Sequence, residues 1–231
     1  MINPKPTVSV IMPALNEELS IGRVIADIPL GLAATVIVVD NGSTDATVRV
    51  AQQAGALVVH EPRRGYGAAC LAGISAAGAC DIFVFLDGDY SDYPEQMPLL
   101  VEPIASGLAD FVIGSRMAGG RNAGVIPAQA RFGNRLACAL MHCIHGFRYS
   151  DLGPFRAISA AALYALDMRD TNYGWTIEMQ IKAVKRGLRI MEVPVNYRSR
   201  IGCSKISGTL WGSVRAGYKI LYTIARLSLK G

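Results

Sequence analysis

An apolar run ends in a dense group of acids within "VFLDGDYSDYPEQ", residues 84–96. The acids are Asp87, Asp89, Asp92 and Glu95. Carboxylate oxygens are the ligands that Mg²⁺ and Mn²⁺ prefer, and a turn at Gly88 would let Asp87 and Asp89 meet one ion. The alternative is a solvated turn, because Asp, Gly, Ser and Pro all favour turns. Asp92 and Glu95 are expected at the turn and at the start of the next helix, with a purely architectural role.

This acidic group follows one of five short apolar runs with the character of buried strands. The runs cover residues 7–13, 35–40, 56–60, 81–87 and 110–115. Helix-like segments lie between them, at about 17–27, 67–79, 95–106 and 129–145, and at 41–55 with Ser43 or Thr44 as the N-cap. A further helix at 173–187 leads into a half-exposed strand at 188–197. This alternation predicts an α/β fold with a mixed, mostly parallel sheet flanked by helices.

The loops after these strands carry most of the polar candidates. In open α/β sheets, ligands bind outside the carboxyl ends of the strands. The loops that follow the first, second, fourth and fifth runs bring Glu17, Asp40, Asp87, Asp89 and Arg116 toward that edge. The expected site is therefore acidic, with a cation beside it.

Composition limits the function classes. The chain has 231 residues, 51% of them hydrophobic, which suits one substantial core. A net charge of +5 favours an anionic partner, but aromatic residues make up only 7% and no basic block is interleaved with them, so a nucleic-acid partner is not indicated. Five cysteines without CxxC spacing indicate neither a disulfide framework nor a zinc site, and a cytoplasmic location fits best. No segment is apolar enough to span a bilayer.

The ordered set of loop sequences resembles glycosyltransferase family 2. The matching segments are "VSVIMPALNEE", "VIVVDNGSTDAT", "RRGYGAACLAGI", "VFLDGDYSDYPE" and "VIGSR". The later "DLGPFRAIS" and "RSRIGCSKIS" resemble dolichyl-phosphate mannose synthases and bacterial polyprenyl-phosphate glycosyltransferases. The resemblance covers residues 8–207 and implies a GT-A fold for a domain of residues 1–207.

The resemblance also implies roles for individual residues. Asp87 and Asp89 would hold Mg²⁺ or Mn²⁺, and Asp89, Arg116 and Arg131 would be catalytic. The nucleotide sugar would be bound by Pro13, Leu15, Glu17, Val38, Asp40, Asp87, Gly88, Arg200 and Lys205. The acceptor would meet Arg116, Arg131 and Asn134, and a hydroxyl acceptor would need a base, for which Asp151 and Glu178 are the candidates. The chain departs from the family pattern at Leu15, Asn41 and Ser91.

The implied activity is inverting, metal-dependent transfer of a hexose from a UDP- or GDP-sugar to a polyprenyl- or dolichyl-phosphate lipid. The alternatives are a related enzyme with a soluble or hydroxyl acceptor and a non-catalytic nucleotide-sugar binder. "GYGAACLAG" is a weak dinucleotide-binding match, because Cys70 stands where the third glycine would be. It would instead cover the nucleotide, together with Arg63 and Arg64, or simply allow close helix packing.

The C-terminal segment, residues 208–231, has the pattern of an amphipathic helix. Its basic residues Arg215, Lys219, Arg226 and Lys230 form one narrow stripe beside an apolar face. Such a helix suits the surface of a membrane, where Lys and Arg side chains reach the headgroups. The alternative is a helix that packs on the domain or on a second copy in a homo-oligomer.

Overall fold

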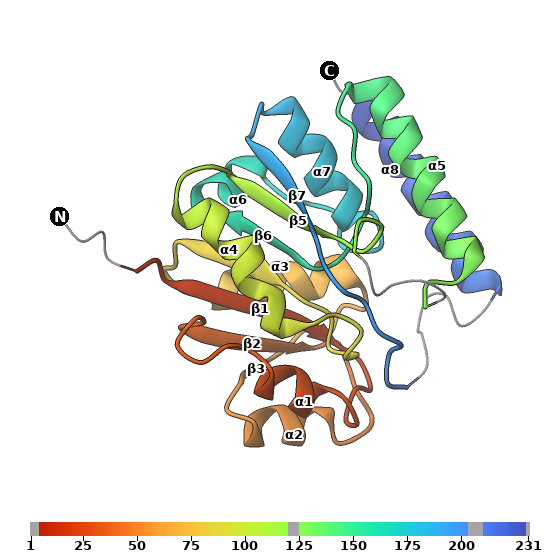
Figure 1. The fold of residues 1–231 in the computed structure, drawn as a ribbon. Coiled ribbons are helices and arrows are strands. Elements are labelled where there is room, and N and C mark those ends of the chain that lie inside the picture. Colours follow the sequence, from red (N-terminus) through yellow and green to blue (C-terminus); the bar gives the residue numbers. More distant parts are fainter. Residues whose placement is uncertain (1–4, 120–124, 203–209, 230–231) are drawn as a thin grey trace.

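The computed structural model describes residues 5–119, 125–202 and 210–229. Its centre is a seven-stranded sheet with the order β3-β2-β1-β4-β6-β5-β7 (Figure 1). The strands are β1 (Val8–Ala14), β2 (Thr35–Asp40), β3 (Leu57–His60), β4 (Ile82–Phe85), β5 (Phe111–Ser115), β6 (Arg156–Ser159) and β7 (Ile190–Pro194). The five apolar runs and the later half-exposed strand are therefore confirmed as strands.

Only β6 was not anticipated from the sequence. It lies between β4 and β5 and runs antiparallel to both, whereas the other pairs are parallel. Its first residue, Arg156, is completely buried, and its guanidinium donates to the carbonyls of Leu152, Gly153 and Thr176. These bonds satisfy a charged side chain inside the sheet, where an isolated charge would be costly.

The helices alternate with the strands, as expected. They are α1 (Ile21–Ala26), α2 (Thr47–Gln53), α3 (Tyr66–Ala76), η1 (Pro94–Gln96), α4 (Met97–Ala105), α5 (Ala128–His145), α6 (Ala160–Leu166), α7 (Trp175–Lys185) and α8 (Leu210–Leu229). The expected N-cap of α2 is wrong: the helix begins at Thr47, whose backbone N–H donates to Asp45 Oδ1 at 3.0 Å. The short α6 was not predicted.

The two faces of the sheet bury separate sets of side chains. Along β1, Ile11 packs with α3 and α7, whereas Val10 and Met12 pack with α1 and α4 on the other face. This division follows from the period of two residues in a strand. Both faces of the central strands are therefore covered, which explains their near-continuous apolar sequences.

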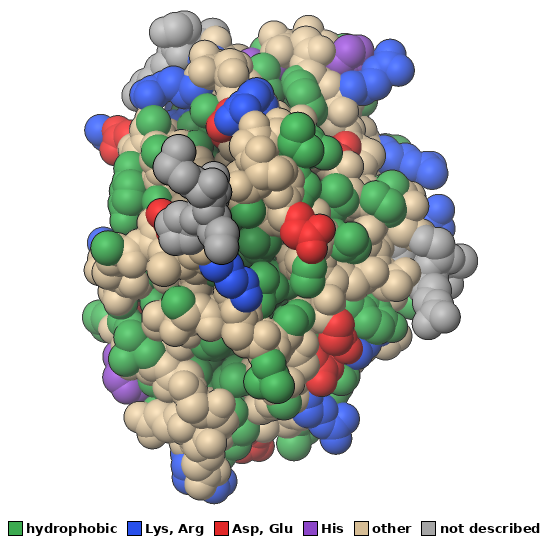
Figure 2. Space-filling view, turned by 60° about the vertical axis from the view of Figure 1, so that its left-hand side comes forward, with side chains coloured by type: hydrophobic (Ala, Val, Ile, Leu, Met, Phe, Trp, Pro, Cys, Tyr) green, Lys and Arg blue, Asp and Glu red, His purple; other side chains and the backbone are tan. Residues whose placement is uncertain are grey.

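Helices α5 and α8 lie side by side at one end of the molecule, next to α7 (Figure 1). Thr223 and Ile224 of α8 are buried in this contact. Among the described residues, none of the helices combines the length and apolar character needed to cross a membrane. On the face shown in Figure 2, basic and acidic side chains are interspersed, so that face presents no continuous charged surface of one sign.

Candidate active site

The candidate site lies at the carboxyl ends of β1, β2, β4 and β5. In the sheet, β2 and β3 lie on one side of β1, and β4 lies on the other side. The direction in which the chain adds strands to the sheet therefore reverses next to β1. A reversal of this kind opens a crevice above the sheet, which is the usual ligand site in α/β folds. The polar loops predicted to meet at this edge do so.

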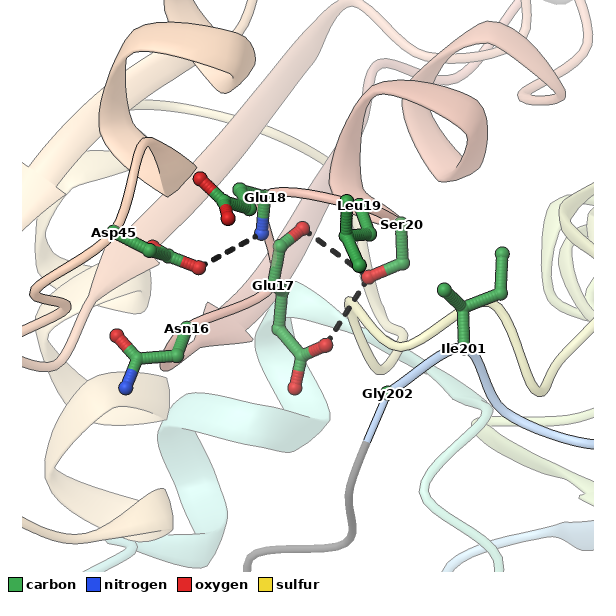
Figure 3. A pocket seen from close by; sticks show the side chains of 8 residues that line it. All are labelled: Asn16, Glu17, Glu18, Leu19, Ser20, Asp45, Ile201 and Gly202. Carbon is green, nitrogen blue, oxygen red and sulfur yellow. Dashed lines mark hydrogen bonds between the residues drawn. The ribbon is translucent and has the colours of Figure 1, made fainter.

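The loops after β1 and β2 are joined by hydrogen bonds. The Asn16 N–H donates to Ser43 Oγ at 3.0 Å, and the Thr44 N–H donates to Asn16 Oδ1 at 2.8 Å. The Glu17 N–H donates to Thr47 Oγ1 at 2.7 Å. Figure 3 shows a small pocket at this junction, lined by residues 16–20, Asp45 and residues 201–202. Glu17 thus lies where loops from both ends of the chain meet.

Asp40 ends β2 with a buried and well-satisfied carboxylate. Its Oδ1 accepts the Ser43 N–H at 2.9 Å, and its Oδ2 lies 3.2 Å from Nδ1 of His60. Burial alone would raise its pKa, but the hydrogen bonds from Ser43 and His60 outweigh it, and the pKa is lowered. Asp40 is therefore ionised at neutral pH and can accept a hydrogen bond from a ligand.

Asp87 and Asp89 stand directly beyond β4 in a segment that we call the metal loop, residues 87–93. Asp89 is buried, and its Oδ2 lies 2.8 Å from Nη1 of Arg200. Its Oδ1 accepts the Ser91 N–H at 3.0 Å. Burial and the charge of Asp89 raise the pKa of Asp87 to about 7, although Arg200 and Arg116 oppose this rise. Asp87 therefore loses its proton only near neutral pH, and a cation beside it would favour its charged form.

These two carboxylates suit a divalent cation. The part of the chain that the structure describes has no group of three or more His, Cys, Asp or Glu side chains able to hold a metal. A metal held by Asp87 and Asp89 would keep its other positions for water and phosphate, as Mg²⁺ commonly does. The raised pKa of Asp87 is the mark of a charge that such an ion would stabilise.

Gly88 lies in a turn of the metal loop, as predicted, and the lack of a side chain lets this turn pack closely against its neighbours. A Cβ there would lie 3.1 Å from Cδ1 of Ile21 and 3.6 Å from the carbonyl oxygen of Pro13. The Cγ of Glu17 would be 3.8 Å away. The left-handed residue of this loop is instead Tyr90, with a φ of 64°. Pro13 and Glu17 therefore lie beside Gly88, and Leu15 stands between them in the sequence, half-buried.

The architectural interpretation of Asp92 is wrong. Its side chain is 1% exposed, and neither carboxylate oxygen has a hydrogen-bond partner. Burial and the charge of Asp87 raise its pKa well above the ordinary value, while Arg116 opposes this effect. Asp92 thus belongs to the same charged cluster as the two proposed metal ligands. A turn acid and a buried acid look alike in sequence, so the sequence carried no signal for this burial.

Arg116 is held by Asp151 in a forked ion pair. Its Nε and Nη2 each lie 2.8 Å from an oxygen of Asp151, which is completely buried. Burial alone would lower the pKa of Arg116, but Asp151 raises it, so the guanidinium stays charged. Asn134 holds the backbone on both sides of Asp151: its amide group donates to the Ser150 carbonyl and accepts from the Leu152 N–H. Asp151 and Asn134 therefore position Arg116.

Other predicted residues are placed differently from the expectation. Val38 is completely buried in the core, so its side chain cannot line a ligand site. Glu178 is also buried, where it accepts the backbone N–H groups of Arg169 and Asp170 and pairs with Lys182 at 2.8 Å. Glu178 therefore stabilises the segment that leads into α7. Arg131 is exposed on α5, and Lys205 lies outside the described residues.

The glycines of "GYGAACLAG" serve close packing. A Cβ on Gly65 would lie 2.1 Å from the carbonyl oxygen of Thr171, and one on Gly67 would lie 2.1 Å from that of Asp170. The start of α3 therefore packs directly against the backbone of Asp170 and Thr171. This contact favours the interpretation that both glycines allow close helix packing. In the preceding loop, Arg64 lies against Gly42, beside the end of β2.

Comparison with known proteins identifies the family. The family described as "Glycosyl transferase family 2" matches residues 9–164, more than half of the chain. The chain belongs to glycosyltransferase family 2. An uncharacterized glycosyltransferase of Mycobacterium tuberculosis is 40% identical over 211 residues, covering 90% of this chain and 94% of that protein. The undecaprenyl-phosphate mannosyltransferase of Micrococcus luteus is 31% identical over 219 residues, with 87% and 88% covered.

Solved glycosyltransferase structures agree with this assignment. Glucosyl-3-phosphoglycerate synthase from Mycobacterium tuberculosis, in complex with Mn²⁺, UDP and glucosyl-3-phosphoglycerate, matches with a TM-score of 0.79 and 27% identity. The match covers 96% of this chain and 80% of that one. The predicted GT-A fold is therefore confirmed, and this family-2 chain is a glycosyltransferase.

Proposed function

We propose that this glycosyltransferase moves a hexose, with inversion, from a UDP- or GDP-sugar to a polyprenyl-phosphate-type lipid in a metal-dependent reaction. The observation that carries the proposal is the placement of Asp87 and Asp89 at the end of β4, between Arg116 and Arg200. Two carboxylates flanked by two arginines suit a metal-bound diphosphate beside a second anionic group.

The donor would lie over the loops after β1, β2 and β4. Asp40 and the loop 13–17 would contact the nucleotide, while Arg200 would leave Asp89 and pair with the diphosphate. Mg²⁺ or Mn²⁺, held by Asp87 and Asp89, would supply Lewis-acid stabilisation of the leaving group. The complex of the related synthase with Mn²⁺ and UDP supports this choice of cofactor.

A phosphate acceptor is supported by the state of the two candidate bases. Asp151 is bound to Arg116, and Glu178 is bound to backbone N–H groups and Lys182. Neither carboxylate is available to take a proton from a hydroxyl group. A phosphate acceptor is already anionic and needs cations instead, which Arg116 provides and Arg131 would supplement. The relative named undecaprenyl-phosphate mannosyltransferase supports a lipid phosphate.

A soluble acceptor is the second candidate. It is favoured by the structural similarity to the glucosyl-3-phosphoglycerate synthase, whose crystals contain phosphoglyceric acid in another complex. Such an acceptor would also carry a negative charge toward Arg116. The two acceptors differ in location, because a lipid phosphate lies at a membrane that the protein would have to contact, whereas a soluble acceptor does not.

The α5–α8 pair supports peripheral membrane contact. Three side chains of α5 and three of α8 are large, apolar or aromatic, and exposed: Phe132, Leu136, Ile144, Tyr218, Leu221 and Tyr222. The expected basic stripe is only partly available, because Lys219 and Arg226 turn toward the buried Asp170, at 2.9 and 4.0 Å. Arg215 and Lys230 lie outside the described side chains. We therefore propose that apolar rather than basic side chains make most of the contact.

A transfer assay with two acceptors tests the proposal. UDP- and GDP-hexoses are incubated with the protein, Mn²⁺ and either undecaprenyl phosphate or phosphoglycerate, and products are identified by mass spectrometry. We expect a glycosylated lipid phosphate and no glycosylated phosphoglycerate. Product with phosphoglycerate alone would replace the lipid acceptor by the soluble one. Absence of product with every donor would contradict the proposed transfer.

A further inference from the structure

The chain beyond β7 returns to the metal loop and runs along it. We call this segment, residues 195–201, the return arm. The Arg198 N–H donates to the Ser91 carbonyl and the Ile201 N–H donates to the Asp89 carbonyl, both at 2.9 Å. Tyr197 forms an antiparallel bridge with Asp92. The return arm thus pairs with the metal loop like a short strand.

The side chain of Arg198 also binds the metal loop. Its Nε donates to the Tyr90 carbonyl at 2.7 Å, and its Nη2 donates to the Asp92 carbonyl at 3.1 Å. The guanidinium carbon lies 3.3 Å from the ring centroid of Tyr90 and 4.3 Å from that of Tyr93. One side chain therefore combines two backbone hydrogen bonds with two cation–π contacts, a set that the planar guanidinium of arginine allows and lysine cannot match.

The residue that Arg198 holds most closely is strained. Tyr90 follows Asp89 directly and has a φ of 64°, in the left-handed region that few side chains adopt. Its hydroxyl donates to Asp27 Oδ2 at 2.8 Å, and the same oxygen lies 3.6 Å from Nη2 of Arg198. A conformation of this kind persists only where the surroundings fix it, and such positions cluster at functional sites. Here Arg198 and Asp27 fix it.

The same arm carries a residue of the site. Arg200 lies two residues beyond Arg198 and pairs with Asp89 at 2.8 Å. Arg198 therefore links the loop that carries Asp89 to the arm that carries Arg200.

We propose that Arg198 is a positioning residue that holds the metal loop and the return arm together, so that Asp87, Asp89 and Arg200 are ready for the metal and the donor diphosphate. The inference rests on the proposed function, and it assigns to Arg198 no contact with substrate. Supporting groups behind metal ligands commonly change metal affinity about 10- to 100-fold when they are replaced.

The test compares Arg198→Lys and Arg198→Met with Arg189→Lys. Arg189 is a suitable control because its side chain pairs with Asp110 and donates to the Gly107 carbonyl at the opposite end of β7, away from the site. Mn²⁺ binding is measured by the electron paramagnetic resonance of the free ion, without donor. Urea unfolding of each variant records stability, and KM and kcat for the donor are measured at several Mn²⁺ concentrations.

We expect both Arg198 variants to bind Mn²⁺ at least about tenfold more weakly than wild type, with KM for the donor rising more than kcat falls, while Arg189→Lys binds Mn²⁺ normally. Folded Arg198 variants with wild-type Mn²⁺ affinity and KM would overturn the inference, and Arg198→Lys keeps the test available if Arg198→Met does not fold. Wild-type protein that binds Mn²⁺ but transfers no sugar would contradict the proposed function alone, because the binding comparison would still stand.

Discussion

Replacing Asp87 by asparagine should remove a pH-dependent cost from the metal-free protein. Burial and the charge of Asp89 raise the pKa of Asp87 from 3.8 to about 7. Between these values the folded state holds more protons than the unfolded state, so stability falls as pH rises. At about 1.4 kcal/mol for each pH unit, the loss reaches up to about 4 kcal/mol by pH 8.

The assay is urea unfolding in the presence of a chelator at pH 5 and pH 8. Wild-type protein should be less stable at pH 8, and Asp87→Asn should reduce that difference by up to about 3 kcal/mol, because about two of the pH units over which Asp87 contributes lie above pH 5. Some difference should remain, because the pKa of Asp92 is raised as well and the two acids titrate together. Saturating Mn²⁺ should restore stability at pH 8 in wild type but much less in the variant.

Asp81→Asn provides the matched control. Asp81 lies just before β4, at the other end of the strand, and its hydrogen bonds with Thr7 lower its pKa. It is ionised in both states at pH 5 and pH 8, so its removal should leave the pH dependence unchanged. The reasoning is refuted if Asp87→Asn shows the same loss between pH 5 and pH 8 as wild type.

Three further predictions concern other parts of the structure. Asp151→Ala should cost about 3–5 kcal/mol in urea unfolding, because it leaves the guanidinium of Arg116 unpaired in a buried site; a loss below about 1 kcal/mol would contradict the buried ion pair. Gly67→Ala should destabilise strongly, because its Cβ would lie 2.1 Å from a carbonyl oxygen, whereas Gly133→Ala in α5 meets open space and should be neutral or stabilising by up to about 1 kcal/mol. Leu221→Glu, on the exposed side of α8, should reduce sedimentation with vesicles of anionic lipid, and unchanged sedimentation would remove α8 from the proposed membrane contact.

The sequence predicted the parts of the fold that local pattern controls. The strands β1, β2, β4 and β5 are apolar on both faces because helices cover both, and that pattern is visible in the sequence. Strand β6 was not predicted, because it has only four residues and begins with the charged Arg156. Its place between β4 and β5 comes from pairing across distant parts of the chain, which no local pattern encodes.

The candidate site shows the same division. The position of Asp87 and Asp89 could be predicted because they follow a strand whose carboxyl end lies at the ligand edge. The burial of Asp92 and the role of Arg198 depend on a return arm that lies 106 residues further along the chain. Val38 was assigned by resemblance and Glu178 as a candidate base for a hydroxyl acceptor, and both side chains are buried in the protein.

The central claim is that Asp87 and Asp89 hold the metal that transfer requires. The most direct measurement is formation of glycosylated undecaprenyl phosphate, followed by mass spectrometry, for wild type and Asp89→Asn with Mn²⁺ or with a chelator. We expect product only for wild type with Mn²⁺. Product formed by wild type in the chelator, or by folded Asp89→Asn at the wild-type rate, would contradict it.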